Sequence, residues 1–199
     1  MWEIVLKGGP LMWPILFCSV LSLALFFERL WFYYRFRRDD TTLAAEVEGL
    51  ARDGRINDAE VVCRRVGSPL SRIYLAALRC AGQERARIKT VVEEIGSREL
   101  APLERYLGLM GTIAALTPLL GLLGTVLGMI RAFNVIATAG VGTPATLGGG
   151  ISEALITTAS GLAVAIPTLL LHKYLSSRAD RLALEVEVRS LHLVDLLEK

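Results

Sequence analysis

The 199-residue sequence has little of what builds a chemical site. Its three cysteines, Cys18, Cys63 and Cys80, are too few and too irregularly spaced for a disulfide framework or a zinc site. Two histidines, His172 and His192, leave little material for metal binding or imidazole chemistry. Only 21% of the residues are charged, and the formal net charge of +2 gives no indication of nucleic-acid binding. We therefore expect neither a metal nor an organic cofactor, and no enzymatic activity.

Strand patterns, internal repeats and low-complexity segments are also missing. What is abundant is apolar: 53% of the residues are hydrophobic, which excludes a disordered chain and argues against an ordinary soluble domain. These residues gather in three long blocks, and a helix needs about 20 mainly apolar residues to cross the hydrocarbon core of a membrane. The sequence predicts an all-α protein with three transmembrane helices.

The first block runs from Gly8 to about Tyr34, and its stretch Leu11–Phe27 carries no charge. Aromatic residues stand near both ends, where the membrane interfaces would lie: Trp13, Trp31, Phe32, Tyr33 and Tyr34. The alternative is a signal peptide, because Lys7 precedes the apolar run. No small-residue cleavage site follows it, however, which favours a transmembrane helix.

The second block, Leu107–Ile130, has 24 residues without a charge, and the third, Ala154–Leu171, has 18. Two starts remain open for the third helix. Thr143 followed by Pro144 is typical of an N-cap and a first helical residue, and the other start is Ser152.

The choice of start fixes the place of Glu153. From Pro144, nine residues at 1.5 Å each put Glu153 about 13 Å along the helix, inside the membrane. From Ser152, it would be an ordinary first-turn acid at the membrane surface.

Basic residues predict the orientation. Fourteen Lys and Arg lie in the Tyr34–Tyr106 connection. The tail after the third block opens with one histidine and three basic residues: His172, Lys173, Arg178 and Arg181. Only Arg131 lies between the second and third blocks, and only Lys7 precedes the first. The positive-inside rule then puts the N-terminus in the periplasm and the C-terminus in the cytoplasm.

The predicted organisation divides the chain into six parts. In chain order these are an extracytoplasmic start with the first span (1–34), a cytoplasmic helical region (35–105), the second span (106–134), an extracytoplasmic loop (135–143), the third span (144–174) and a cytoplasmic C-terminal helix (175–199).

The connection and the tail are predicted to be helical. Breakers at Asp53-Gly54 and Gly67-Ser68-Pro69 separate short helices, which cover Thr41–Arg52, Asp58–Arg65, Leu70–Cys80 and Glu84–Gly96. From Arg98 the helical pattern continues through Glu104 into the second span, which predicts one long helix that projects from the membrane. Leu182–Leu197 has the pattern of an amphipathic helix that packs on a neighbour.

Few polar side chains interrupt the last two spans. A charge at the centre of a bilayer costs about 3 kcal/mol, so Glu153 at that depth would face a bundle interior or a wet path. Together with Thr125 and Thr158 it would form a polar lining, to which Thr117 and Thr157 are further candidates. For glycines such as Gly124 and Gly128, close helix packing is the better interpretation.

Three long stretches resemble the MotA/TolQ/ExbB proton channel family, and within it the ExbB/TolQ branch. In this sequence they read GGPLMWPIL at residues 8–16 with Glu28-Arg29-Leu30; TPLLGLLGTV at 117–126 with Gly128-Met129-Ile130 and Phe133; and GISEALITTA at 150–159 with Gly161-Leu162 and Ala165-Ile166-Pro167. The order of the spans and the large first connection also agree.

The resemblance implies a symmetric homo-oligomer in the bacterial inner membrane, usually a pentamer, in which the second and third spans line a pore. Two ExbD/TolR-like partners would each place one span and one aspartate in that pore. Proton flow would drive work through a TonB- or TolA-like protein, such as TonB-dependent import of substrates. Thr125, Glu153 and Thr158 match the family's pore-lining positions. A buried glutamate can stay neutral, and we hypothesise that Glu153 tunes pore hydration and the proton affinity of the partner's aspartate, which Thr125 and Thr158 would contact.

Other functions remain open. A TolQ-like subunit would maintain the outer membrane rather than drive import. A membrane scaffold without ion flow would use Glu153 and the threonines only for bonds between helices. A membrane enzyme has no support, since no Ser–His pair falls in the spans, and three spans without an inverted repeat are too few for a secondary transporter.

Overall fold

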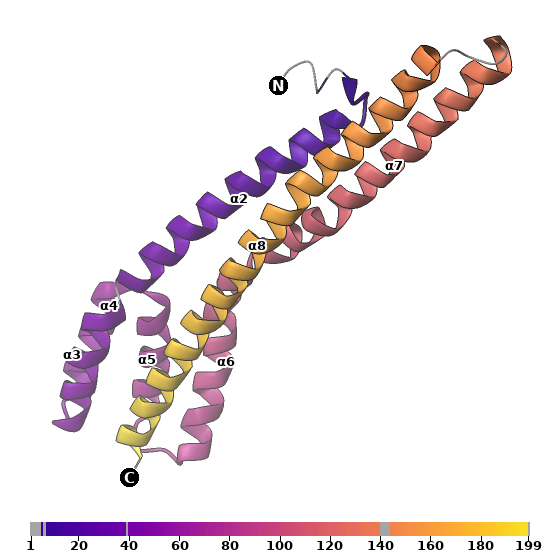
Figure 1. Ribbon diagram of the computed structural model, residues 1–199. Helices are drawn as coiled ribbons and strands as arrows, with labels where there is room; N and C mark the ends of the chain where they lie inside the picture. Colours follow the sequence, from indigo (N-terminus) through magenta and orange to yellow (C-terminus); the bar gives the residue numbers. More distant parts are fainter. Residues whose placement is uncertain (1–4, 6, 39, 140–143, 199) are drawn as a thin grey trace. The chain divides into compact units, whose positions relative to one another are not determined.

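A computed structural model describes residues 5, 7–38, 40–139 and 144–198. Helices dominate these residues, and no strand is found among them (Figure 1). The helices are α2 (Met12–Arg38), α3 (Asp40–Arg52), α4 (Ile56–Val66), α5 (Pro69–Arg79), α6 (Arg85–Glu104), α7 (Leu107–Ala139) and α8 (Pro144–Leu197). The all-α prediction is confirmed.

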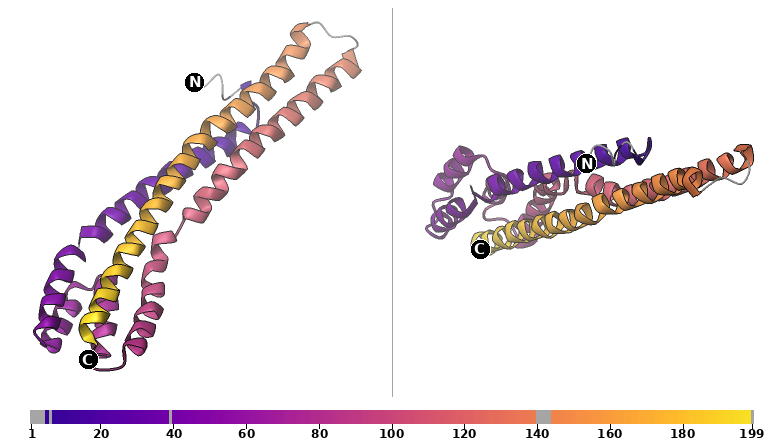
Figure 2. Two further views of the ribbon diagram at one scale, coloured as in Figure 1. Left: turned by 60° about the horizontal axis from the view of Figure 1, so that its bottom comes forward. Right: turned by 45° about the horizontal axis from the view of Figure 1, so that its top comes forward.

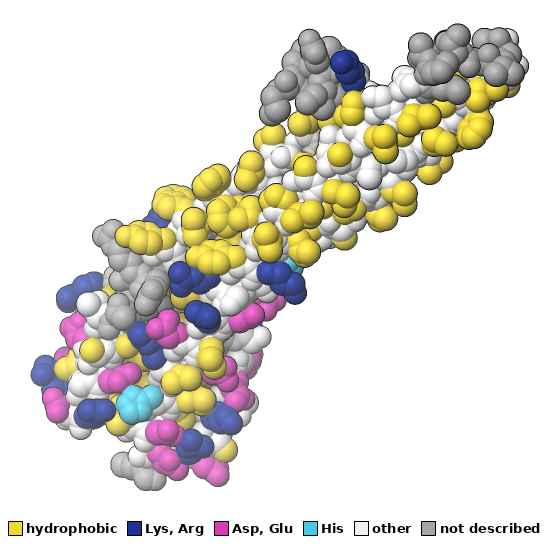
Figure 3. Space-filling model, in the orientation of Figure 1, with side chains coloured by type: hydrophobic (Ala, Val, Ile, Leu, Met, Phe, Trp, Pro, Cys, Tyr) yellow, Lys and Arg dark blue, Asp and Glu magenta, His cyan; other side chains and the backbone are white. Residues whose placement is uncertain are grey.

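The chain divides into two compact units. The span unit contains residues 1–28 and 106–174, and the polar unit contains residues 29–105 and 175–199. Helices α2 and α8 each contribute to both units. Figure 2 shows α8 as one unbroken helix. Figure 3 shows hydrophobic side chains over the visible face of α2, α7 and the first part of α8, while charged side chains gather over α3 to α6.

Three helical stretches are long and apolar enough to cross a membrane: Met12–Phe36, a stretch within Arg85–Thr138, and Gly148–Leu197. Many large apolar side chains on them are exposed, including Phe17, Leu119 and Leu170. Water would penalise so much exposed apolar surface, whereas lipid would not. The prediction of three membrane-spanning helices is confirmed at the level of length and composition.

Helices α7 and α8 pack closely through small residues. A Cβ atom at Gly128 would lie 2.7 Å from the carbonyl oxygen of Gly150, and one at Gly161 would lie 2.8 Å from the carbonyl oxygen of Thr117. Both distances are too short for real side chains, so only glycine lets the two backbones approach this far. The interpretation of the span glycines as packing residues agrees with this geometry.

The expected continuous helix from Arg98 into the second span is wrong. Helix α6 ends at Glu104, α7 begins at Leu107, and Tyr106 between them has a φ of 67°. A non-glycine residue in the left-handed region breaks an α-helix. Two side chains of α2 bind carbonyl groups in the last turn of α6: Arg29 donates to the Pro102 oxygen (3.0 Å) and the Tyr33 hydroxyl to the Leu103 oxygen (2.7 Å).

The polar unit has its own core. Helices α3 to α6 bury large side chains such as Leu43, Leu70, Tyr74 and Ile88. Helix α8 adds a buried stripe at spacings of three and four residues: Leu175, Ala179, Leu182, Val186, Ser190, Leu193 and Leu197. The predicted amphipathic tail is therefore confirmed, but it forms no separate helix, because α8 runs unbroken from Pro144 to Leu197.

Local capping explains where the short helices of the polar unit end. Gly67, at a φ of 67°, ends α4 in the left-handed conformation that glycine adopts without strain. The Ser68 side chain then accepts a hydrogen bond from the Ser71 backbone N–H (3.2 Å) and starts α5, with Pro69 at its first position. Each observed boundary of α3 to α5 lies within two residues of the predicted one.

Candidate functional site

Glu153 lies well inside helix α8. The helix begins at Pro144, the earlier of the two starts that the sequence left open; the proposed cap at Thr143 lies outside the described residues. Nine residues, or two and a half turns, separate Pro144 from Glu153. Glu153 is therefore not a first-turn acid, and its side chain is only 20% exposed.

The Glu153 carboxylate forms an ion pair with Arg131 of α7. The Arg131 Nη1 atom donates to Glu153 Oε1. Sequence reasoning missed this partner, because it treated Arg131 only as the single basic residue beyond the second span. The signal was available: in an antiparallel hairpin, residues equally far from the connection face each other. Arg131 lies eight residues before the end of α7, and Glu153 nine after the start of α8.

The segment before α2 covers the same carboxylate. Gly9 has a φ of 73°, and a Cβ atom there would overlap Glu153 Oε1. Next to it, the backbone oxygen of Gly8 accepts a hydrogen bond from the Thr157 hydroxyl (2.7 Å). The Gly8-Gly9 pair is thus bonded to α8 through the Gly8 oxygen, and Gly9 lies against the carboxylate because it has no side chain.

Thr125 and Thr158 occupy neighbouring turns of the α7–α8 contact. The Thr158 hydroxyl crosses to α7 and donates to the Gly121 oxygen (2.8 Å), one turn before Thr125. The Thr125 hydroxyl donates within its own helix to the Leu122 oxygen (2.6 Å). Both side chains are half-buried. The structure therefore places these two predicted residues on one hairpin with Glu153, five residues before Thr158 on α8.

Thr117 and Thr157 are in a different position. Both are almost fully buried, and their hydroxyls already have acceptors inside the chain. Thr117 donates to the Ile113 oxygen (2.6 Å), and Thr157 bonds the oxygens of Gly8 and Glu153. In this conformation both side chains present almost no surface to anything outside the chain, and of the two hydroxyls only that of Thr157 bonds another segment.

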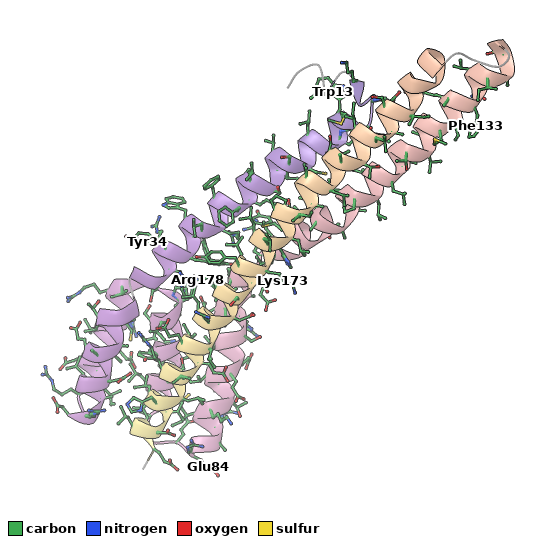
Figure 4. The ribbon with its side chains drawn as sticks, viewed as in Figure 1. Trp13, Tyr34, Glu84, Phe133, Lys173 and Arg178 are labelled. Carbon is green, nitrogen blue, oxygen red and sulfur yellow. The ribbon has the colours of Figure 1, made fainter. Side chains whose placement is uncertain are left out.

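Side chains at the two ends of the span unit are typical of membrane interfaces. Trp13 of α2 and Phe133 of α7 are exposed, and Figure 4 shows both toward the end where α7 and α8 connect. Lys173 lies on α8 toward the other end. Twenty residues of helix, about 30 Å, separate Glu153 from Lys173, which matches the thickness of a hydrocarbon core.

Comparison with known proteins identifies the family of this chain. The sequence model of the MotA/TolQ/ExbB proton channel family matches residues 65–188, which is more than half of the chain. The chain belongs to this family. The matched region contains all of α7 and every candidate site residue on α8, so the ion pair, the threonines and the glycine contacts belong to the part that the family shares. The first span lies outside the match.

Relatives point to the ExbB/TolQ branch of the family. A putative ExbB-like biopolymer transport protein 1 of Synechocystis is 38% identical over 175 residues, 86% of this chain and 69% of the relative. A second ExbB-like protein of that organism is 35% identical over 167 residues, 83% of this chain and 80% of the relative. TolQ of Pseudomonas aeruginosa is 42% identical over 86 residues, 43% of this chain and 37% of the relative.

Proposed function

We propose that the chain is a proton-channel subunit of an inner-membrane complex that couples the proton-motive force to work on the outer membrane, such as TonB-dependent import. The observation that carries this proposal is the α7–α8 hairpin. It gathers Glu153, Thr125 and Thr158 within or next to the uncharged stretches Leu107–Ile130 and Ala154–Leu171. Membership of a proton channel family supports the same activity.

The proposed assembly is a homo-oligomer, a pentamer by resemblance, with α7 and α8 of each subunit around a central pore. Two single-span ExbD/TolR-like partners would occupy the pore, and each would carry the aspartate that takes up the proton. The excess of basic residues between α2 and α7 and after Lys173 supports a periplasmic N-terminus and a cytoplasmic C-terminus.

The energy available to such a device is adequate. One proton that crosses 100 mV releases about 2.3 kcal/mol, so a few protons supply enough for a mechanical step. The half-buried hydroxyls of Thr125 and Thr158 can exchange their intrachain acceptors for the partner's aspartate without moving a charge. A TonB- or TolA-like protein would receive the work.

The test is proton flux in vesicles that contain the chain together with its single-span partner. We expect flux that follows the membrane potential and is abolished when the partner's aspartate is replaced by asparagine. The same low leak with either partner would instead support a membrane scaffold without ion flow.

TolQ-like maintenance of the outer membrane is the alternative role, because two TolQ proteins are among the relatives, each similar over less than half of this chain. A deletion strain separates the roles. Loss of energised uptake of iron complexes with an intact outer membrane supports the import role. Sensitivity to detergents with normal uptake supports the TolQ-like role.

A further inference from the structure

Arg131 brings a second charge into the candidate site. It lies on α7 within hydrogen-bonding contact of Glu153, and its side chain is 49% exposed against 20% for the glutamate. The better covered member of the pair is thus the carboxylate. The helices around it expose apolar side chains such as Ile130 and Leu155.

Three elements surround the Glu153 side chain. Helix α7 supplies the guanidinium, and α8 supplies Thr157, whose hydroxyl bonds the Glu153 backbone oxygen (2.8 Å). The segment before α2 supplies Gly9, whose backbone lies against the carboxylate. Among the described residues, Arg131 is the one cation recorded in contact with this carboxylate.

The two charges of the pair balance each other. A guanidinium keeps its proton at all accessible pH values. Loss of the carboxylate's charge would therefore leave Arg131 without its counter-ion.

We infer that Arg131 is a positioning residue that keeps Glu153 charged, so that Glu153 acts as a fixed counter-ion of the pore wall and not as a carrier of the transported proton. This inference rests on the proposed function, and it replaces the hypothesis that Glu153 is neutral. The pair contributes no net charge to the wall, and the Gly8-Gly9 segment holds its acidic member in place.

Flux measurements on neutral variants test the inference. Glu153→Gln leaves Arg131 as an unpaired charge, and Arg131→Gln removes the cation that keeps Glu153 charged, so we expect each variant to lower partner-dependent flux by about ten-fold. The double variant has no unpaired charge and should recover most of that loss, and Arg131→Lys, which keeps the cation, should stay near the wild-type flux. A double variant as inactive as Glu153→Gln would overturn the inference, since a proton carrier cannot be restored by removing its neighbour.

Infrared spectroscopy of the purified complex tests the charge state without any flux. The wild-type spectrum minus the Glu153→Gln spectrum at neutral pH should show an ionised carboxylate and no protonated carboxyl band. In the Arg131→Gln background, the same subtraction should show a protonated carboxyl band. A protonated band in the wild type, or none in the Arg131→Gln background, would overturn the inference. Failure of the proposed function alone would abolish the flux and leave these spectra unchanged.

Discussion

The threonine hydroxyls of the span unit differ in what they bind. Thr112 and Thr125 donate to carbonyl groups of their own helix, whereas Thr158 donates across to α7 and Thr157 to the segment before α2. A hydroxyl bonded within its own helix adds nothing to the contact between helices, while one that crosses links two elements. The same residue type therefore has different consequences at each position.

Replacement of Thr158 by valine should weaken the α7–α8 contact. The variant keeps the shape of the side chain but loses the bond to the Gly121 oxygen, which is worth about 0.6 kcal/mol in a membrane. Thr112→Val is the matched control, because its hydroxyl bonds only the Gly108 oxygen of its own helix. Thermal unfolding in detergent should show a lower midpoint for Thr158→Val alone. Equal midpoints for the two variants would contradict the crossing bond.

Cys63 should be an unreactive thiol. It is a buried residue of α4. Burial, and to a smaller extent the nearby charge of Glu60, raise its pKa from 9.0 to about 12. Because alkylation requires the thiolate, Cys63 should stay unlabelled at pH 8 in the folded protein, while the partly exposed Cys80 is labelled. Mass spectrometry after maleimide treatment measures both, and rapid labelling of Cys63 would be evidence against the buried position.

The same burial predicts a loss of stability at alkaline pH. The folded protein disfavours the thiolate of Cys63, so this contribution is complete below pH 9 and is lost as the pH rises toward about 12. Burial and the charge of Glu48 raise the pKa of Tyr74 from 10, with a loss of the same sign. Denaturant unfolding between pH 8 and 11 should show this decline, with a smaller slope for Cys63→Ala. An unchanged slope would refute the assignment to Cys63.

At the scale of elements, the α7–α8 hairpin depends on backbone contact. Gly161 meets the Thr117 oxygen and the Gly121 backbone, while Gly148 on the same helix has open space around it. Gly161→Ala should destabilise the protein by roughly 1–3 kcal/mol, as overpacking does, and Gly148→Ala should be neutral or slightly stabilising. Thermal unfolding compares the two variants; a stable Gly161→Ala protein would mean that the helices are farther apart.

The end of α6 depends on α2. The buried hydroxyl of Tyr33 bonds the Leu103 oxygen, whereas its neighbour Tyr34 is 73% exposed. Tyr33→Phe leaves a buried carbonyl group without this donor and should cost about 1–2 kcal/mol of unfolding free energy. Tyr34→Phe should cost nothing measurable in the same denaturant titration, and a similar loss in both variants would contradict the specific role of Tyr33.

The sequence-based interpretation was accurate where a local sequence feature determines the structure. Hydrophobic block length and the breakers at Gly54 and Gly67 are local features, and the helices that they indicated are present. The break at Tyr106 was missed, because nothing in a tyrosine marks a left-handed conformation in advance. Arg131 was missed as a partner because its role depends on where α7 ends, and the sequence placed that end too early.

For the whole molecule, two separate inputs support the account. The family match covers residues 65–188 and establishes a proton channel family, while the placement of Arg131, Glu153, Thr125 and Thr158 on one hairpin comes from the structure. The polar unit has its own core and includes α8 from Leu175 onward, so one continuous helix carries both the candidate site and part of that core.

The most direct test of the central claim is partner-dependent proton flux in energised vesicles, compared between site variants and a matched control. Thr125→Val, Thr158→Val and Glu153→Gln should each lower the flux by about ten-fold, because each alters the polar lining of the α7–α8 hairpin. Thr112→Val, on α7 but 13 residues before Thr125 and outside the candidate site, should match the wild type. Wild-type flux in all three site variants would contradict the account and place the proton pathway elsewhere.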